Sequence, residues 1–178
     1  VATTQSEIGY LLQSALESEY RALGIEKRVA TVLTKVLVDS EDPAYKNPTK
    51  PIGPFYSQKV AEQKKKELGW DIVEDASRGY RRVVPSPEPK HIYETEIIKI
   101  LIEAGVTVIA GGGGGIPVIE KGNGDIEGSE AVIDKDLASA LLAARLGADL
   151  LAIPTGVERV ASNFGEPDQQ WLDRLTII

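Results

Sequence analysis

The sequence predicts an α/β fold, namely a three-layer α/β/α sandwich with an open, mostly parallel sheet. Short apolar runs of strand length alternate with longer segments whose apolar residues recur at helical spacing, which is typical of strand–helix repeats. In residues 29–39, apolar side chains fall on both faces, as in a strand covered on both sides. With 178 residues, the chain is long enough for one compact domain and too short for two ordinary ones.

The first quarter of the chain is expected to form a helix, a strand and an irregular segment. Apolar residues from Ile8 to Leu23 recur at helical spacing, and Gly24 follows as a helix stop. The strand 29–39 comes next. Residues 42–54 contain four prolines and are expected to lack regular structure, because proline interrupts both helices and ladders.

The segment 40–88 has the features of an insertion into the repeated pattern. Ser57 precedes a polar helix that runs to Leu68 and stops at Gly69, and a short strand follows at residues 81–84. The pattern then resumes with a helix over 92–103 and a strand over 106–110. Helix followed by strand is half of a β-α-β repeat.

The last part of the chain repeats this order. Residues 118–120 and 131–133 flank a Gly-Asn-Gly-Asp turn at 122–125, which predicts a hairpin. A helix is expected from Asp136 to about Leu146, and Gly147 ends it. The apolar run 150–153 is then expected to form another strand of the parallel sheet.

The composition argues against several classes of function. A net charge of −7 argues against a nucleic-acid partner, because phosphate-binding surfaces carry a basic excess. With no Cys and one His, the chain lacks the material for disulfides, thiolate metal sites or a Ser-His-Asp triad. The apolar runs are far shorter than the roughly twenty residues of a membrane helix, and the N-terminus lacks a secretory pattern. We therefore expect a cytoplasmic protein without a membrane partner.

The strongest local signal is a run of five glycines, residues 111–115, directly after an apolar strand. Without side chains, successive main-chain N–H groups can turn toward one anion at the carboxyl end of a sheet, which predicts a phosphate-binding loop. The alternative interpretation is a flexible turn. The run matches neither the Walker A motif, which needs Gly-Lys-Ser/Thr, nor the dinucleotide fingerprint.

Two lysines are candidates for contact with a phosphoryl group. Lys50 lies among three prolines in residues 47–54, which restrict the backbone and can hold the ammonium toward a ligand. The alternative is an incidental lysine in a surface loop. Lys135 lies between Asp134 and Asp136 at a helix start, where it can offer a cation while a carboxylate orients it or a metal. The alternative is an ordinary capped helix start.

A fourth segment, residues 153–157, leaves the last predicted strand at its carboxyl end. A Thr-Gly turn at such a position suits contacts with a nucleotide. The alternative is a simple exit from a strand into a loop.

In this order, the four segments resemble carbamate kinase, a family with the amino-acid kinase fold. The resemblance spans nearly the whole chain, and its two most specific motifs are the stretches around Lys50 and Lys135. The matching stretches are Gln5, residues 8–10, 30–34, 47–54, 81–87, 112–117, 130–136 and 163–168.

The resemblance implies a fold, an activity and partners. The fold would be an open sheet between layers of helices, with a protruding subdomain within residues 40–88 that closes over the carbamoyl phosphate site. The activity would be that of an ATP:carbamate phosphotransferase, which moves a phosphoryl group reversibly between carbamoyl phosphate and ADP, giving ATP and carbamate in arginine catabolism. Mg²⁺ would accompany the nucleotide, and the protein would be a homodimer.

Matched motif by motif, the resemblance also implies roles for single residues. Lys50 would contact the substrate phosphate, Lys135 would neutralise charge on the transferring phosphoryl group, and Asp136 would organise the lysines. Main-chain N–H groups would approach the substrate or its phosphate at Gly112, Gly113, Gly114 and Gly115. The turn beside the nucleotide would be formed by Thr155, Gly156 and Val157. No residue is predicted as a protein ligand to a metal.

Two motifs of the family are not among the 178 residues. These are an N-terminal Gly-Gly-Asn phosphate loop and a late lysine motif that helps to hold the nucleotide phosphates. We therefore expect the chain to be the central portion of a single carbamate kinase-like domain. Two alternatives stay open: the same site acting toward carbamoyl phosphate synthesis, and a non-catalytic nucleotide-binding or assembly fragment of such a kinase.

Overall fold

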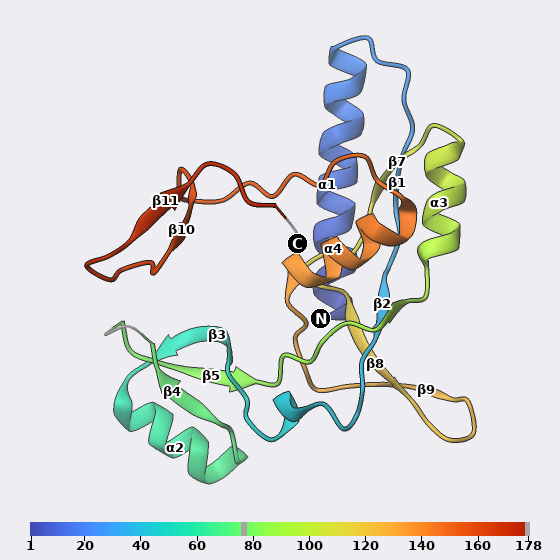
Figure 1. The fold of residues 1–178 in the computed structure, drawn as a ribbon. Coiled ribbons are helices and arrows are strands. Elements are labelled where there is room, and N and C mark those ends of the chain that lie inside the picture. The colour runs from blue at the N-terminus through green and yellow to red at the C-terminus, as the bar shows by residue number, and fades with distance from the viewer. Residues whose placement is uncertain (76–77, 177–178) are drawn as a thin grey trace.

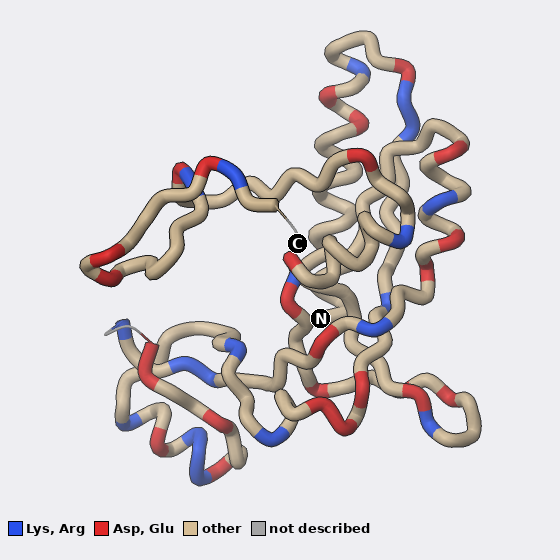
Figure 2. The backbone as a smooth tube through the Cα atoms, in the orientation of Figure 1, with Lys and Arg blue, Asp and Glu red and all other residues tan. Residues whose placement is uncertain are grey.

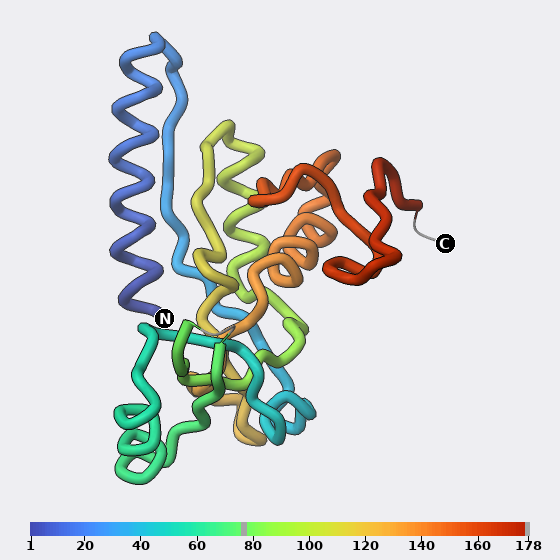
Figure 3. Tube along the Cα trace, turned by 90° about the vertical axis from the view of Figure 1, so that its left-hand side faces the viewer, coloured from blue at the N-terminus to red at the C-terminus, as the bar shows by residue number. Residues whose placement is uncertain are grey.

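The computed structural model describes residues 1–75 and 78–176, and it has the predicted α/β class. The helices are α1 (Ala2–Ala22), α2 (Gln58–Leu68), α3 (Thr95–Glu103) and α4 (Lys135–Leu146). Figure 3 shows α1 on one side of the central strands, with α3 and α4 on the other. This arrangement is the layered order that alternating strands and helices predict. None of the described helices is long and apolar enough to cross a membrane.

The central strands come from three chain segments, residues 29–37, 91–92 and 107–128, which lie side by side (Figure 1). Their bounds are β1 (Val29–Thr31), β2 (Lys35–Leu37), β6 (His91–Ile92), β7 (Thr107–Ile109), β8 (Ile116–Glu120) and β9 (Ile126–Gly128). β1 pairs with β7 and β2 pairs with β8, both in parallel. β6 joins β2, and β9 joins β8, both antiparallel. The four-stranded sheet β6-β2-β8-β9 is therefore mixed, with its parallel pair at the centre, whereas β1 and β7 form a separate parallel pair.

The predicted strand 29–39 is interrupted, and so is the strand beside it. Three residues, 32–34, separate β1 from β2, whereas six residues, 110–115, separate β7 from β8. Because two paired strands with unequal insertions cannot keep one continuous ladder, the longer segment leaves the sheet as a loop. This segment contains residues 111–115, called the glycine loop below. The break in the sheet is therefore the place where the loop is presented.

The protruding unit at the lower left of Figure 1 contains α2 and a three-stranded antiparallel sheet in the order β3-β5-β4. Its strands are β3 (Lys50–Tyr56), β4 (Ile72–Glu74) and β5 (Tyr80–Val84). The prediction that residues 42–54 lack regular structure is wrong, because a 3₁₀ turn forms at Pro43–Tyr45 and β3 begins at Lys50. β3 lies at the edge of its sheet, where prolines are tolerated because one side of the strand needs no ladder donor.

Two predicted strands are absent from the described structure. The hairpin partner of β8 is β9, not residues 131–133, because the tight turn sets the register that pairs Val118 with Gly128. The run 150–153 forms no strand: Leu150 is 81% exposed, and no described strand pairs with this segment. The chain instead ends in a small antiparallel hairpin of β10 (Val160–Ser162) and β11 (Gln170–Leu172).

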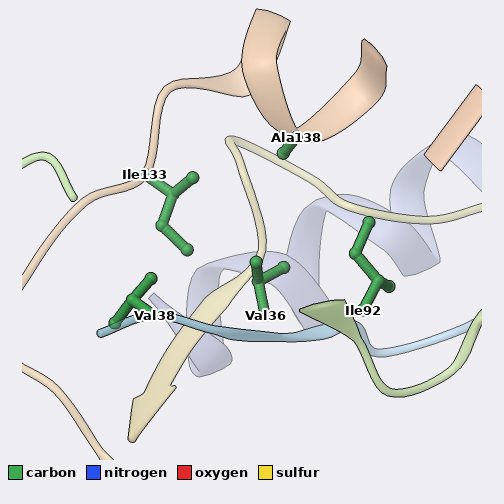
Figure 4. Close-up of a cluster of buried hydrophobic side chains, with 5 residues drawn as sticks. All are labelled: Val36, Val38, Ile92, Ile133 and Ala138. Carbon is green, nitrogen blue, oxygen red and sulfur yellow. The ribbon is translucent and has the colours of Figure 1, made fainter. Parts of the chain in front are cut away.

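A buried apolar cluster connects the sheet to the start of α4 (Figure 4). Its members come from β2 and the residue after it, from β6, from the segment before α4 and from α4 itself. They are Val36, Val38, Ile92, Ile133 and Ala138. Since Ile133 is only 1% exposed and precedes Asp134 directly, burial of this cluster fixes the position of the α4 N-terminus relative to β2 and β8.

Candidate functional site

The glycine loop packs against the main chain that leads into α4. Gly114 is buried with φ of +130°, a conformation that residues with a Cβ rarely adopt. A Cβ at this position would lie 2.3 Å from the carbonyl oxygen of Ile133. The close approach of two backbones therefore requires glycine here, and it places the loop beside Asp134 and Lys135.

The main-chain N–H groups of the loop fall into two sets. Gly111 donates to Thr34 Oγ1 at 2.8 Å, and residues 114 and 115 donate to the carbonyl oxygen of Gly111. Gly112 and Gly113 are exposed, and no hydrogen bond within residues 1–75 and 78–176 uses their N–H groups. Of the four glycines predicted to approach a phosphate, these two have N–H groups that no hydrogen bond of the described residues uses.

Lys50 reaches from the protruding unit to the start of α4. Its Nζ donates to Asp134 Oδ2 at 2.8 Å, although the two residues are 84 positions apart in the sequence. The other carboxylate oxygen, Oδ1, accepts the N–H of Asp136 at 2.9 Å and so caps the helix. The hydrogen bond from Lys50 and the capping hydrogen bonds lower the pKa of Asp134 below its usual value. One carboxylate thus holds the lysine and the helix together.

This ion pair predicts a pH-dependent contribution to stability. Because the pKa of Asp134 is lowered by folding, its contribution is present above the ordinary value of 3.8 and is lost as the pH falls through the lower folded value. Asp134→Asn keeps a capping acceptor but loses the charge, so we expect the free energy of unfolding to fall by about 0.5–1 kcal/mol at neutral pH. Urea unfolding of both proteins at a series of pH values measures this difference in the free energy of unfolding. A difference that is the same at every pH would contradict the role of the ion pair.

Lys135 is the first residue of α4, and its side chain is 68% exposed. Its Nζ lies 3.8 Å from Asp136 Oδ1. Among the described residues, no hydrogen bond or ion pair joins Asp136 to Lys50, and the carboxylate that binds Lys50 is Asp134 rather than the predicted Asp136. The signal for Asp134 in the sequence is its N-cap position, since a carboxylate there is fixed by the helix it caps.

A cavity of about 30 Å³ lies between the glycine loop and α4. It is lined by loop residues 111, 112 and 114, by Thr34 and by residues 135, 138, 139 and 142 of α4. The N-terminal end of α4 carries partial positive charge because its first N–H groups have no partner within the helix. The loop amides, this helix end and the two lysines are therefore brought to one region.

The turn predicted to lie beside the nucleotide is not brought into this region. Thr155, Gly156 and Val157 are exposed, and within the described part of the chain the Thr155 hydroxyl forms hydrogen bonds only with the main chain of Val157. Among the described residues, no hydrogen bond or ion pair joins this turn to the glycine loop or to α4. The described residues also contain no group of three or more His, Cys, Asp or Glu side chains that could hold a metal ion.

Comparison with known proteins adds to this geometry. Residues 14–178 match the model of the Amino acid kinase family. The chain belongs to the amino acid kinase family.

Within the amino acid kinase family, the chain is similar to carbamate kinases. It is 52% identical over 176 residues to the carbamate kinase of Thermococcus kodakarensis, and 56% identical over 177 residues to the carbamate kinase-like protein YqeA of Escherichia coli. Each match covers 99% of this chain and 56% of the relative. The chain therefore spans about half the length of these relatives, and the resemblance to carbamate kinase is confirmed over that span.

Solved structures give the same result for the fold. The structure of carbamate kinase from Giardia lamblia bound to AMP-PNP is 43% identical, with a TM-score of 0.81, and the match covers 96% of this chain and 54% of that chain. A crystal structure from Aeropyrum pernix is 46% identical, with a TM-score of 0.85 and coverage of 96% and 55%.

Proposed function

We propose that the chain is part of a carbamate kinase and that its site binds the phosphoryl group that moves between carbamoyl phosphate and ADP. The observation that supports this most is the meeting of free glycine-loop amides, the N-terminus of α4 and two lysines that are 85 positions apart in the sequence. Similarity to carbamate kinases over 99% of the chain supports the same assignment.

The proposed reaction needs positive charge more than it needs a nucleophilic side chain. A terminal oxygen of the ADP β-phosphate attacks the phosphorus of carbamoyl phosphate, a new P–O bond forms, and the bond from phosphorus to the carbamate oxygen breaks. The products are ATP and carbamate. Because both reactants are anions, Lys50, Lys135 and the loop N–H groups would hold them together and stabilise the charge on the transferring group.

The charge of the protruding unit supports anionic substrates. Residues 46–84 contain nine Lys and Arg against five Asp and Glu, although the whole chain has a net charge of −7. Figure 2 shows Lys and Arg along α2 and the adjoining strands of this unit. A basic unit next to the site attracts anions over a distance of about a Debye length. This agrees with a role of residues 40–88 as a subdomain that closes over carbamoyl phosphate.

The nucleotide would be ADP or ATP, and the proposal keeps the turn at residues 155–157 beside it. Mg²⁺ would enter with the nucleotide substrate, bound to its phosphates, as is usual in phosphoryl transfer. The binding of AMP-PNP by the carbamate kinase of Giardia lamblia supports a nucleotide site in the same fold.

The proposal extends to the wider setting expected from the resemblance: a cytoplasmic homodimer acting in arginine catabolism. Exposed apolar side chains on α1 and α3 support a protein partner, because such residues are usually covered in an assembly. They include Ile8, Leu11, Leu12, Ile97 and Ile100. Sedimentation equilibrium of the chain tests the dimer directly.

A coupled assay of ATP formation from carbamoyl phosphate and ADP tests the proposed function. It is applied to the 178-residue chain and to a chimera in which the chain replaces the matching segment of the Thermococcus kodakarensis carbamate kinase. ATP formation by either protein supports the proposal. If only the chimera is active, the chain by itself is a nucleotide-binding or assembly part of the enzyme. If the chimera folds and neither protein forms ATP, the proposal is wrong.

A further inference from the structure

Two glutamines on α1 make the same kind of contact with the sheet. Gln13 Oε1 accepts the N–H of Thr31 at 2.9 Å, and Gln5 Oε1 accepts the N–H of Thr34 at 2.7 Å. The two glutamines differ in the hydrogen bonds of the side-chain nitrogen, Nε2. Gln13 Nε2 donates to Glu17 Oε1 at 3.0 Å, whereas Gln5 Nε2 is buried and has no partner in the described part of the chain.

Gln5 is the glutamine that touches the glycine loop. Its side chain lies against Gly112, where a Cβ would come within 3.0 Å of Gln5 Cγ and 3.3 Å of Nε2. Thr34, which Gln5 holds by its N–H, accepts the N–H of Gly111 at 2.8 Å. Gln5 is only 7% exposed, so its unpaired donor faces the underside of the loop and not the solvent. A buried donor without an acceptor is costly, and it therefore calls for an explanation.

The geometry of a peptide unit offers an explanation for the unpaired donor of Gln5. In a planar trans peptide, the N–H of one residue and the carbonyl of the preceding residue point in opposite directions. If the N–H of Gly113 turns outward to an anion, the carbonyl of Gly112 turns inward, toward Gln5 Nε2. Since Gly112 already has φ of +50° and neither residue carries a Cβ, the rotation meets little steric resistance.

We infer that Gln5 is a positioning residue for the glycine loop. Its Oε1 fixes the base of the loop through Thr34. Its Nε2, which has no hydrogen-bond partner among the described residues, donates to the Gly112 carbonyl when an anion binds to the N–H of Gly113. The inference rests on the proposed function, because it takes the exposed loop amides as the donors to a phosphate. It assigns to α1 a part in phosphate binding without contact with the ligand.

Amide hydrogen exchange of the 178-residue chain, followed by NMR, tests the first contact. In the ligand-free chain, Gln5→Met is expected to raise the exchange rates of the Gly111, Gly114 and Gly115 N–H groups by about fivefold, because one hydrogen bond at the loop base is lost. The matched control Gln13→Met breaks the equivalent contact with Thr31 and should leave these three rates unchanged. Equal effects of the two variants, or no effect of Gln5→Met, would overturn the inference.

The second contact is tested with inorganic phosphate at concentrations that saturate each variant, so that affinity is not the quantity compared. Phosphate is expected to slow exchange of the Gly113 N–H by about fivefold in the wild-type chain. Gln5→Glu keeps an acceptor for Thr34 but has no N–H at neutral pH, and it should show less slowing. Equal slowing in both proteins, or none in the wild type, would contradict the donor role. ATP formation is measured separately, so the proposed function is judged independently.

Discussion

Replacing Lys135 with alanine is expected to lower kcat for ATP formation by about 10²–10³-fold in whichever protein of the coupled assay is active. The reason is that charge stabilisation by a preorganised group at a transferring phosphoryl group is commonly of this size. The same change should leave the free energy of unfolding within about 0.5 kcal/mol of the original, because the side chain is 68% exposed and its nearest carboxylate oxygen is 3.8 Å away. Steady-state kinetics and urea unfolding measure the two effects.

Lys99 provides the matched control for this prediction. It is an exposed lysine on α3, and no ion pair of the described residues involves it. Lys99→Ala should therefore change neither kcat nor stability. An equal loss of activity in the two variants would indicate a general charge effect, and an unchanged kcat in Lys135→Ala would remove Lys135 from the proposed mechanism.

Gly114→Ala is expected to lower the free energy of unfolding by about 3 kcal/mol. The new Cβ would lie 2.3 Å from a main-chain oxygen, so the backbone of the loop or of residues 133–135 must move. The φ of +130° adds strain for any residue with a Cβ. Thermal or urea unfolding followed by circular dichroism measures the loss.

The neighbouring glycine gives the control. A Cβ on Gly113 would meet no atom within 4 Å, and its φ lies outside the left-handed region. Gly113→Ala should therefore change stability by less than about 0.5 kcal/mol. If the two variants are equally stable, the packing of the loop against Ile133 is not the reason for glycine at position 114.

The pair Lys50–Asp134 connects the protruding unit to the α/β body. Lys50 lies on β3 of that unit, and Asp134 precedes α4 of the α/β body. Their 2.8 Å contact holds Lys50, a candidate substrate-binding residue, against the N-terminal end of α4. A bound phosphate would compete with Asp134 for the same ammonium. The proposed site is thus one in which anion binding exchanges one charged partner for another.

The sequence by itself determined the elements whose signals are local. The ends of α2 and α4 follow from Gly69 and Gly147, which adopt the left-handed conformation that few other residues tolerate. The helical spacing of apolar residues indicated α1, and the tight turn at 122–125 indicated the hairpin, though not the position of its second strand. The two lysines and the glycine run were visible for the same reason, since their types and neighbours carry the signal.

Only the tertiary structure decided which distant groups meet. Residues 150–153 have the composition of a strand, but a strand needs a partner, and none is present among the described residues. Lys50 pairs with Asp134 and not with Asp136 because of where β3 and α4 lie. The contact of Gln5 with the base of the loop depends on how α1 packs on the sheet. Local propensity extends over a few residues, whereas these contacts are set by strand register and by the packing of segments far apart in the chain.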